Sequence, residues 1–166
     1  MSDISIRRLT EADMEDFRDI RQEASEKHPE YFGHSLEVTV KKVHKCCDVN
    51  RKGNALLGAY SGNKLIGIAI VTRKQGGQFE HIATLWGVYV REAFRGAGVG
   101  KKLVETCIEY AKTTAELLQL QMKVTTSNEK ALHVYQSLGF AIYGTEKQAV
   151  KVQSGYNDEH LLSLTL

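Results

Sequence analysis

The stretch Arg95-Gly96-Ala97-Gly98-Val99-Gly100 is the part of the sequence that most constrains how this chain can fold. An apolar run rich in β-forming residues, 83–90, precedes the stretch, and apolar residues follow it at helical spacing: Leu103, Val104, Cys107, Ile108 and Ala111. The pattern predicts a strand, a glycine loop and a helix, in that order. Because glycine tolerates positive φ and the first helical turn leaves N–H donors unpaired, this loop favours binding of a phosphate or pyrophosphate. Arg95, Lys101 and Lys102 add positive charge beside it.

Two common phosphate loops do not match this stretch. A Walker loop needs Ser or Thr after its Gly-Lys pair, whereas Lys102 follows Lys101 here. A dinucleotide loop has the spacing G-x-G-x-x-G in an early βαβ unit, whereas this G-x-G-x-G lies past the middle of the chain. On the loop alone, a glycine-rich turn that only packs strand against helix stays open.

The glycine loop and a second sequence motif together resemble the pattern of a known protein family. Residues 85–90 followed by 95–100 resemble the acetyl-CoA signature Q/R-x-x-G-x-G/A of the GNAT N-acetyltransferase superfamily. The segment from Asn128 through Ala131 and Tyr135 to Gly139-Phe140 is similar to that family's N-x-x-A-x-x-x-Y-x-x-x-G-F. Both blocks occur in family order. Glu92 departs from the pattern, since many members carry proline there.

Length and composition are those of one ordinary domain, so we expect a single acetyltransferase domain over residues 1–166. The net charge of +2 favours neither nucleic acid nor a membrane as partner, and no apolar run approaches the roughly 20 residues of a transmembrane helix. Three cysteines form no disulfide framework and the N-terminus lacks a signal-peptide core, so we expect a cytoplasmic protein. His44, Cys46 and Cys47 crowd one helical turn, so no metal is expected.

The remaining patterns predict the other elements. Expected strands are 4–7, 54–60, 65–72, Phe79–Val90, 118–124, 140–152 and 160–166. Expected helices are Glu11–Ser25 with Thr10 and Asp13 as a capping pair, a helix capped by Ser35 that ends near Val49, the helix after the glycine loop, and one that Asn128 starts and Gly139 ends. An antiparallel meander followed by strand–helix–strand–helix predicts an α+β fold with a mixed, mostly antiparallel central sheet of about six or seven strands and about four flanking helices. The resemblance implies the same fold.

The resemblance implies that acetyl-CoA binds between the strands Phe79–Val90 and Leu118–Thr125, which diverge near the loop. Gly87 supports a bulge there. The positions that match the family's cofactor contacts use their main chain: Val88, Tyr89 and Val90 for pantetheine, and Arg95, Gly96, Gly98, Val99, Gly100 and Lys101 for pyrophosphate. Core packing for the two valines and a solvated helix face for Lys101 and Lys102 are the alternatives.

Acetyl transfer to an amine makes three chemical demands. The amine, with a pKa of about 10, must lose a proton, the thioester carbonyl needs a donor, and the departing thiolate needs a proton. Tyr135 matches the family tyrosine that supplies this proton or bonds the sulfur, although a core aromatic is the alternative. Asn128 is expected to cap its helix and to contact the cofactor arm.

The general base is less defined by the sequence. Family bases often lie on the strand before the glycine loop, where Glu80 and His81 are the candidates, acting directly or through water. Strand alternation places the two side chains on opposite faces, and Glu80 holds the more family-like position. Either residue could instead be a polar residue at the strand edge.

The resulting hypothesis is an N-acetyltransferase that moves an acetyl group from acetyl-CoA directly to a primary amine of a small molecule or a protein. A non-catalytic acyl-CoA-binding or sensor domain is the main alternative, and a nucleotide-binding protein is a second one. The expected acceptor is a small-molecule or peptide amine, shaped in part by the loop that carries His28, Tyr31, Phe32 and His34. Homodimers are common in the family.

Overall fold

The computed structural model describes residues 3–48 and 51–166. Within them, seven strands form one sheet in the order β1-β2-β3-β4-β5-β7-β6, in which only β4 and β5 pair in parallel. Their bounds are β1 Ile4–Arg8, β2 Ala55–Ser61, β3 Lys64–Arg73, β4 Ile82–Val90, β5 Gln119–Thr125, β6 Ala141–Val152 and β7 Gly155–Thr165. The predicted mixed, mostly antiparallel sheet is confirmed.

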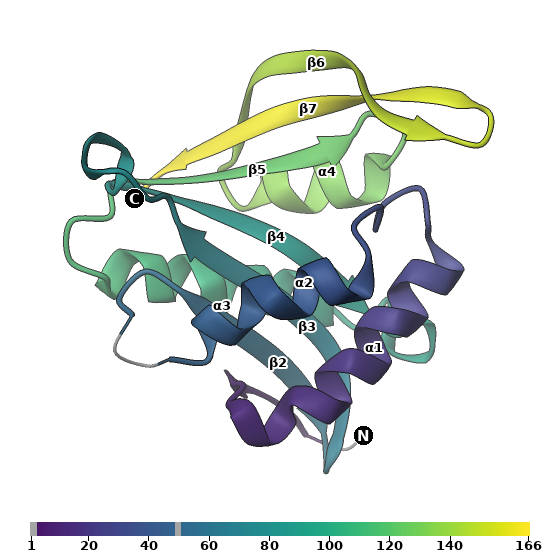
Figure 1. The fold of residues 1–166 in the computed structure, drawn as a ribbon, viewed down its shortest axis with the longest axis vertical. Helices are drawn as coiled ribbons and strands as arrows, with labels where there is room; N and C mark the ends of the chain where they lie inside the picture. Colours follow the sequence, from purple (N-terminus) through teal and green to yellow (C-terminus); the bar gives the residue numbers. More distant parts are fainter. Residues whose placement is uncertain (1–2, 49–50) are drawn as a thin grey trace.

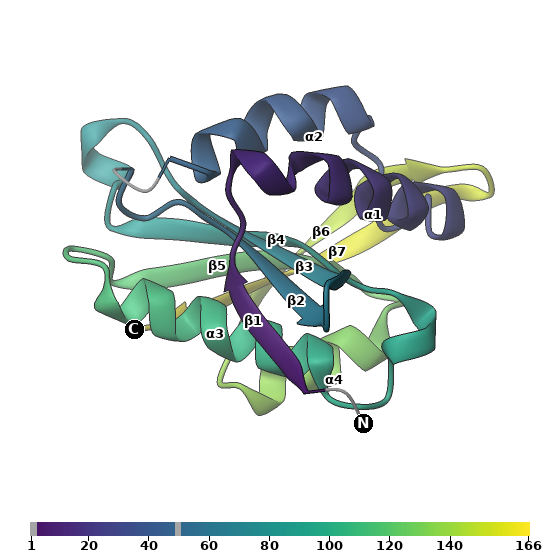
Figure 2. The ribbon, with the colours of Figure 1, turned by 90° about the horizontal axis from the view of Figure 1, so that it is seen from below.

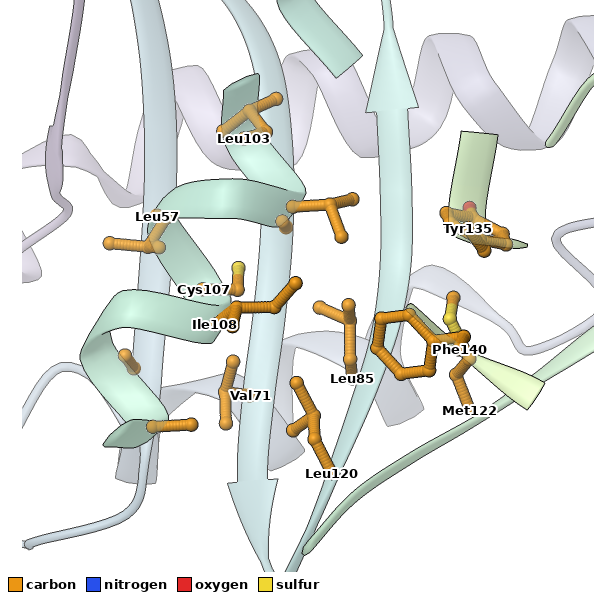
Figure 3. Close-up of a cluster of buried hydrophobic side chains, with 14 of the residues drawn as sticks. Leu57, Val71, Leu85, Leu103, Cys107, Ile108, Leu120, Met122, Tyr135 and Phe140 are labelled. Carbon is orange, nitrogen blue, oxygen red and sulfur yellow. The ribbon is translucent and has the colours of Figure 1, made fainter. Parts of the chain in front are cut away.

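Helices cover both faces of the sheet, with α1 (Met14–Lys27) and α2 (Leu36–Val43) on one face and α3 (Val99–Thr113) and α4 (Glu129–Ser137) on the other (Figures 1 and 2). Because successive side chains of a strand point to opposite faces of the sheet, the strands contribute to two hydrophobic layers. Ile68 and Ile70 pack with residues of α1 and α2. Val71 and Leu85 pack toward α3 and α4, as Figure 3 shows. The predicted α+β architecture with four main helices is thus present in the described residues.

The expected helix caps are formed. Ser35 Oγ accepts from the Val38 N–H at 3.3 Å and Asn128 Oδ1 accepts from the Ala131 N–H at 3.3 Å. Gly139, at φ +96°, follows α4 in the left-handed conformation that ends many helices. Asp13 accepts from the Thr10 N–H at 2.8 Å, but residues 11–13 form a 3-10 turn, and α1 itself begins at Met14.

Two predicted strand starts are wrong. The strand expected from Phe79 begins at Ile82, because Gly76 and Gly77 adopt positive φ and lead into a 3-10 turn, Gly77–Phe79. Phe79 is 55% exposed, so burial does not hold it in the sheet. β7 begins at Gly155 rather than His160, since its pairing with β6 continues to the hairpin turn.

The second helix ends earlier than predicted, at Val43, and a 3-10 turn continues to Cys46. Val49, the predicted end, lies outside the described residues. Among the described residues, no helix is both long and apolar enough to cross a membrane.

Candidate active site

The two parallel strands at the centre of the sheet separate after a short paired segment. β4 and β5 pair only at Ile82–Gln119, Ala83–Leu120 and Thr84–Gln121, and Figure 1 shows them diverging beyond this segment. We call the region between residues 85–90 of β4 and 122–125 of β5 the wedge. Along the wedge, the edge of β4 that faces β5 has no strand partner in the described part of the chain, so its backbone can pair with an extended ligand.

A β-bulge lies where the strands separate. Gly87 and Val88 together oppose a single residue of β3, because the neighbouring pairs are Ile68–Tyr89 and Ile70–Trp86. Gly87 has φ +64°, and a Cβ atom there would lie 2.8 Å from Cδ1 of Ile70. Both the conformation and the close approach require glycine. The bulge expected at Gly87 is therefore present.

The glycine loop leads from β4 into the N-terminus of α3. Gly96 and Gly98 have φ +81° and +77°, and a Cβ atom at either would meet nothing within 4 Å. The helix begins with the Lys102 N–H donating to the Gly98 carbonyl at 3.0 Å, so the N–H groups of residues 99–101 have no acceptor within the helix. These donors, the helix dipole and the exposed Lys101 and Lys102 fit a phosphate anion.

The Arg95 side chain does not follow the loop outward. Its Nε donates to the Val90 carbonyl at 2.8 Å, and its guanidinium carbon lies 5.4 Å from the centre of the Tyr89 ring. A terminal nitrogen lies 3.2 Å from Nε2 of His28. The structure therefore places the guanidinium against β4 and the end of α1, while the Arg95 main chain belongs to the loop.

Tyr135 comes from α4 and reaches the wedge from the α3/α4 side. Figure 3 shows it across β4 from Leu57 and Cys107. The residue is only 8% exposed, and its hydroxyl forms no hydrogen bond within the described residues. Burial, with a smaller effect of Cys107, raises the pKa of Tyr135 to about 12. The hydroxyl therefore stays protonated at neutral pH and can serve as a proton donor.

The two candidate bases lie at the other end of β4. Glu80 is exposed in the turn before the strand, where its carbonyl accepts from Arg73 Nε. His81 is also exposed, and its carbonyl accepts the N–H of Leu118 at 2.8 Å. Since neither residue is in the strand, the expected alternation of their side chains does not apply. Both lie at the paired end of β4 and β5, away from the glycine loop.

The sequence alone did not reveal a polar cluster on the face of β5 that points away from α3 and α4. Lys123 Nζ lies 2.7 Å from Glu146 and 3.8 Å from Glu159, which belong to β6 and β7. Thr125 ends β5 and is buried, and its Oγ1 has no hydrogen-bond partner within residues 3–48 and 51–166. The alternation of 119–125 marks Lys123 and Thr125 as one polar face, but the pairing of β5, β7 and β6 is needed to find their partners.

Comparison with known proteins shows which family this chain belongs to. The sequence model of the Acetyltransferase (GNAT) family matches residues 8–140, and the chain belongs to this family. It is 26% identical over 165 residues to the L-amino acid N-acetyltransferase AaaT of Escherichia coli (strain K12), covering 98% of each chain.

Solved structures share the whole fold. The ribosomal-protein-alanine N-acetyltransferase of Brucella melitensis superposes with a TM-score of 0.83 at 26% identity, covering 98% of this chain and 99% of that chain. The putative acetyltransferase yncA of Salmonella typhimurium, solved with its cofactor acetyl-CoA, gives 0.84 at 19% identity over 98% of this chain and 94% of that chain.

Family and fold together define the activity. The protein is an acetyl-CoA-dependent N-acetyltransferase, which transfers an acetyl group to an amine. The non-catalytic alternative considered from the sequence is not favoured.

Proposed function

We propose that acetyl-CoA binds in the wedge and that its acetyl group passes directly to a primary amine of a small molecule or a peptide. The observation that carries this proposal is the end of β4–β5 pairing beside the Gly87 bulge, next to a loop whose two glycines open onto free space. An extended pantetheine arm can pair with the free edge of β4, and a pyrophosphate can bind the N–H groups at the start of α3.

The residues present fit this ligand. The main chain of Val88, Tyr89 and Val90 would hold pantetheine, although the Val90 carbonyl already accepts from Arg95. Pyrophosphate would be held by main-chain N–H groups of the loop, at Gly96, Gly98, Val99, Gly100 and Lys101, whereas the Arg95 N–H predicted for this role already donates to the Glu92 carbonyl at 3.1 Å. The side-chain oxygen of Asn128, Oδ1, caps α4, so the side-chain N–H₂ group is the part left to contact the cofactor arm.

When bound, acetyl-CoA supplies a thioester whose carbonyl carbon can be attacked by an amine. Tyr135 has two properties that suit a proton donor for the departing sulfur: its hydroxyl is protonated at neutral pH, and no group in the described residues engages it. We therefore retain Tyr135 as the proposed general acid. Glu80 is the base predicted from sequence, and it lies exposed in the turn before β4, at the end of the strand away from the glycine loop.

The first test is thermal unfolding of the protein alone and with acetyl-CoA, ATP or NAD. A ligand that binds only the folded state at a hundred times its Kd adds about 2.7 kcal/mol of stability, which raises the Tm measurably. A shift with acetyl-CoA and none with ATP or NAD is expected. A shift with ATP or NAD instead would contradict the assignment of the glycine loop.

The acceptor is tested by thiol release from acetyl-CoA with a panel of amines. The relatives' names guide the panel: free L-amino acids, a peptide beginning with alanine, and spermidine, since a spermidine N(1)-acetyltransferase of Escherichia coli (strain K12) shares 30% identity over 57 residues. Release with at least one amine, and an acetylated product by mass spectrometry, is the expected outcome.

Location and assembly are also proposals. The described cysteines, Cys46, Cys47 and Cys107, are unpaired, which fits a reducing compartment, and we place the protein in the cytoplasm. We propose a homodimer because homodimers are common in the family, and light scattering on the purified protein tests this oligomeric state. We treat residues 1–166 as one catalytic domain and expect no nucleic-acid or membrane partner.

A further inference from the structure

Three strands bring a row of polar side chains together on one face of the sheet. Met122 and Val124 of β5 point into the core beneath α3 and α4, so Lys123 and Thr125 face the other side. Thr125 lies directly opposite Glu159 of β7, and Glu159 lies opposite Glu146 of β6. Figure 1 shows that α1 and α2 lie in front of β2–β4 and leave this part of the sheet uncovered.

The cluster carries one unbalanced negative charge. Lys123 Nζ faces two carboxylates, and it makes its short contact, 2.7 Å, with Glu146. Glu159 keeps only an ion pair at 3.8 Å and forms no hydrogen bond within the described residues, although its side chain is just 19% exposed. A largely buried carboxylate without hydrogen-bond donors is costly, so the arrangement favours a ligand that brings N–H donors and positive charge.

The hydroxyl of Thr125 is a second polar group without a hydrogen-bond partner in the described residues, and it lies on the same face of the sheet as Glu159. Thr125 is 6% exposed, and its buried Oγ1 has no hydrogen-bond partner among the residues that the structure describes. It ends β5 at the border of the wedge, directly across from Glu159. A hydroxyl oxygen can accept from an N–H donor, as a carboxylate does. Two polar groups without a hydrogen bond in the described residues thus occupy paired positions of β5 and β7 beside the wedge.

The faces of the sheet separate the two halves of the chemistry. Tyr135 belongs to the core on the α3/α4 side, whereas Glu159 and Thr125 lie on the opposite side. An amine held by Glu159 would therefore approach a thioester in the wedge from one face while the sulfur leaves toward Tyr135 on the other. Addition of the amine to the thioester carbonyl and departure of the thiolate from the tetrahedral intermediate can each then be assisted by its own positioned group.

We propose that Glu159 binds the ammonium group of the acceptor and acts as its general base, with Lys123 and Thr125 positioning the carboxylate and the nitrogen. The inference rests on the proposed function. Glu159 takes one proton from R–NH₃⁺ and later passes it to solvent. The nitrogen lone pair then forms the C–N bond as the C–S bond breaks with its electron pair on sulfur. Tyr135 gives its proton to that sulfur and is reprotonated from solvent, and the second nitrogen proton is lost to solvent.

The experiment compares Glu159→Gln with the wild-type protein, using the amine of the panel that the wild type acetylates. We expect turnover at neutral pH to fall about 100-fold. The loss should shrink toward pH 10, where the amine deprotonates by itself. The charged groups that face Glu159 in the described residues, Lys123 on β5 and Glu146 on β6, are unchanged in this variant. Acetyl-CoA affinity should stay at the wild-type value, while calorimetry on the CoA-bound protein should show weaker amine binding.

Two further variants separate this role from a structural one. Asp158→Asn removes the neighbouring carboxylate on the other face of β7, where it accepts from the Gln148 N–H at 2.8 Å, and should cost stability but not turnover. Thr125→Val replaces an unpaired buried hydroxyl with a methyl group, so stability should hold or rise while KM for the amine rises.

Each contrary outcome has its own meaning. If Glu159→Gln keeps full turnover, or if Glu80→Gln alone loses it, the inference is overturned while the proposed function stands. A Glu159→Gln loss that is the same at every pH, with unchanged amine binding, also overturns it. If the wild-type protein binds acetyl-CoA but acetylates none of the amines, the proposed function itself fails, and this inference fails with it.

Discussion

The Arg95 guanidinium lies 3.2 Å from the imidazole of His28, which joins the loop before α3 to the residue that ends α1. His28 also stacks on Tyr31, with ring centres 6.1 Å apart, and lies 3.7 Å from Glu92. The segment between α1 and α2, expected to shape the acceptor site, is thereby in contact with the proposed pyrophosphate loop. The contacts of His28 with Arg95 and Glu92 therefore help to fix the conformation of both the segment between α1 and α2 and the loop before α3.

Arg95→Gln tests whether this arginine works through structure or through charge. The side chain donates to the Val90 carbonyl and faces His28, so its loss should lower the Tm. The salt dependence of acetyl-CoA binding should match the wild type, because the guanidinium faces away from the loop's open side. Lys101→Gln is the control that should flatten this dependence. An equal flattening by Arg95→Gln would place the guanidinium on the phosphate after all.

Gly98→Asp should abolish acetyl-CoA binding, weakening it by at least about 100-fold, or about 2.7 kcal/mol. The new carboxylate would project into the open space before the loop and repel a pyrophosphate, and φ +77° adds strain of about 1–2 kcal/mol. Gly62→Asp is the matched control, since Gly62 has φ +59° and equally open surroundings in the β2–β3 turn. Both variants should lose similar stability in thermal unfolding, but only Gly98→Asp should lose affinity in calorimetry. Unchanged affinity there would refute the loop assignment.

Tyr135→Phe should lower kcat about 100-fold while leaving acetyl-CoA affinity and stability nearly unchanged. The reason is that the Tyr135 hydroxyl has no hydrogen-bond partner in the described residues, so only the chemistry loses it. Tyr110→Phe should show the reverse pattern. Its hydroxyl donates to the Asn54 carbonyl at 2.9 Å and accepts from the Gly53 N–H at 3.1 Å, so its loss costs about 1–3 kcal/mol without a change in turnover. Equal kcat in Tyr135→Phe would remove this residue from the mechanism.

Much of the fold follows from local signals. The caps at Ser35 and Asn128, the alternation in the strands and the glycine loop are each read within a few residues, and the structure confirms these predictions. The strand start at Phe79 was predicted wrongly because an aromatic residue directly after the turn residues 75–78 resembles the first residue of a strand. Positive φ at Gly76 and Gly77 decides instead for a turn.

The candidate site was less accessible from sequence, because half of it depends on strand pairing. The glycine loop, Gly87 and Tyr135 lie in motifs that a family resemblance can locate. The cluster of Lys123, Thr125 and Glu159 exists only because β7 pairs between β5 and β6 and places residues more than thirty positions apart directly opposite each other. No local pattern encodes that register.

Gly87→Ala should destabilise the protein by about 1–3 kcal/mol and weaken acetyl-CoA binding, because the new methyl group meets Ile70 Cδ1 at 2.8 Å in a backbone conformation that L-residues avoid. The double variant Gly87→Ala/Ile70→Val removes the clashing methyl group but not the conformational strain. It should recover part of the stability relative to Gly87→Ala in denaturant unfolding. No recovery would mean that the clash contributes little and that the positive φ alone demands glycine.

Asp13→Asn should cost about 1–3 kcal/mol of stability at pH 7, since the Asp13 carboxylate accepts from Arg7 at 2.7 and 2.9 Å, from the Thr10 N–H at 2.8 Å and from the Tyr60 hydroxyl at 3.1 Å. The hydrogen bonds from Arg7, outweighing the opposing effect of burial, hold the pKa of Asp13 well below its ordinary value of 3.8. A carboxyl whose pKa is lowered by folding stabilises the folded state above its unfolded pKa and loses that contribution as the pH falls below it. The difference between wild type and variant should therefore be constant above about pH 5 and shrink from about pH 4 downward.

Asp16→Asn is the control for that measurement, because Asp16 lies on the same helix and forms no hydrogen bond within the described residues. Its effect on the free energy of unfolding should stay below about 1 kcal/mol, the usual limit for an acidic residue near a helix N-terminus. If the Asp13→Asn difference kept its full size at pH 2, the stabilisation would come from shape rather than from the carboxylate's charge. A difference that disappears with acid instead identifies the Arg7–Asp13 pair as the electrostatic link between β1 and the start of α1.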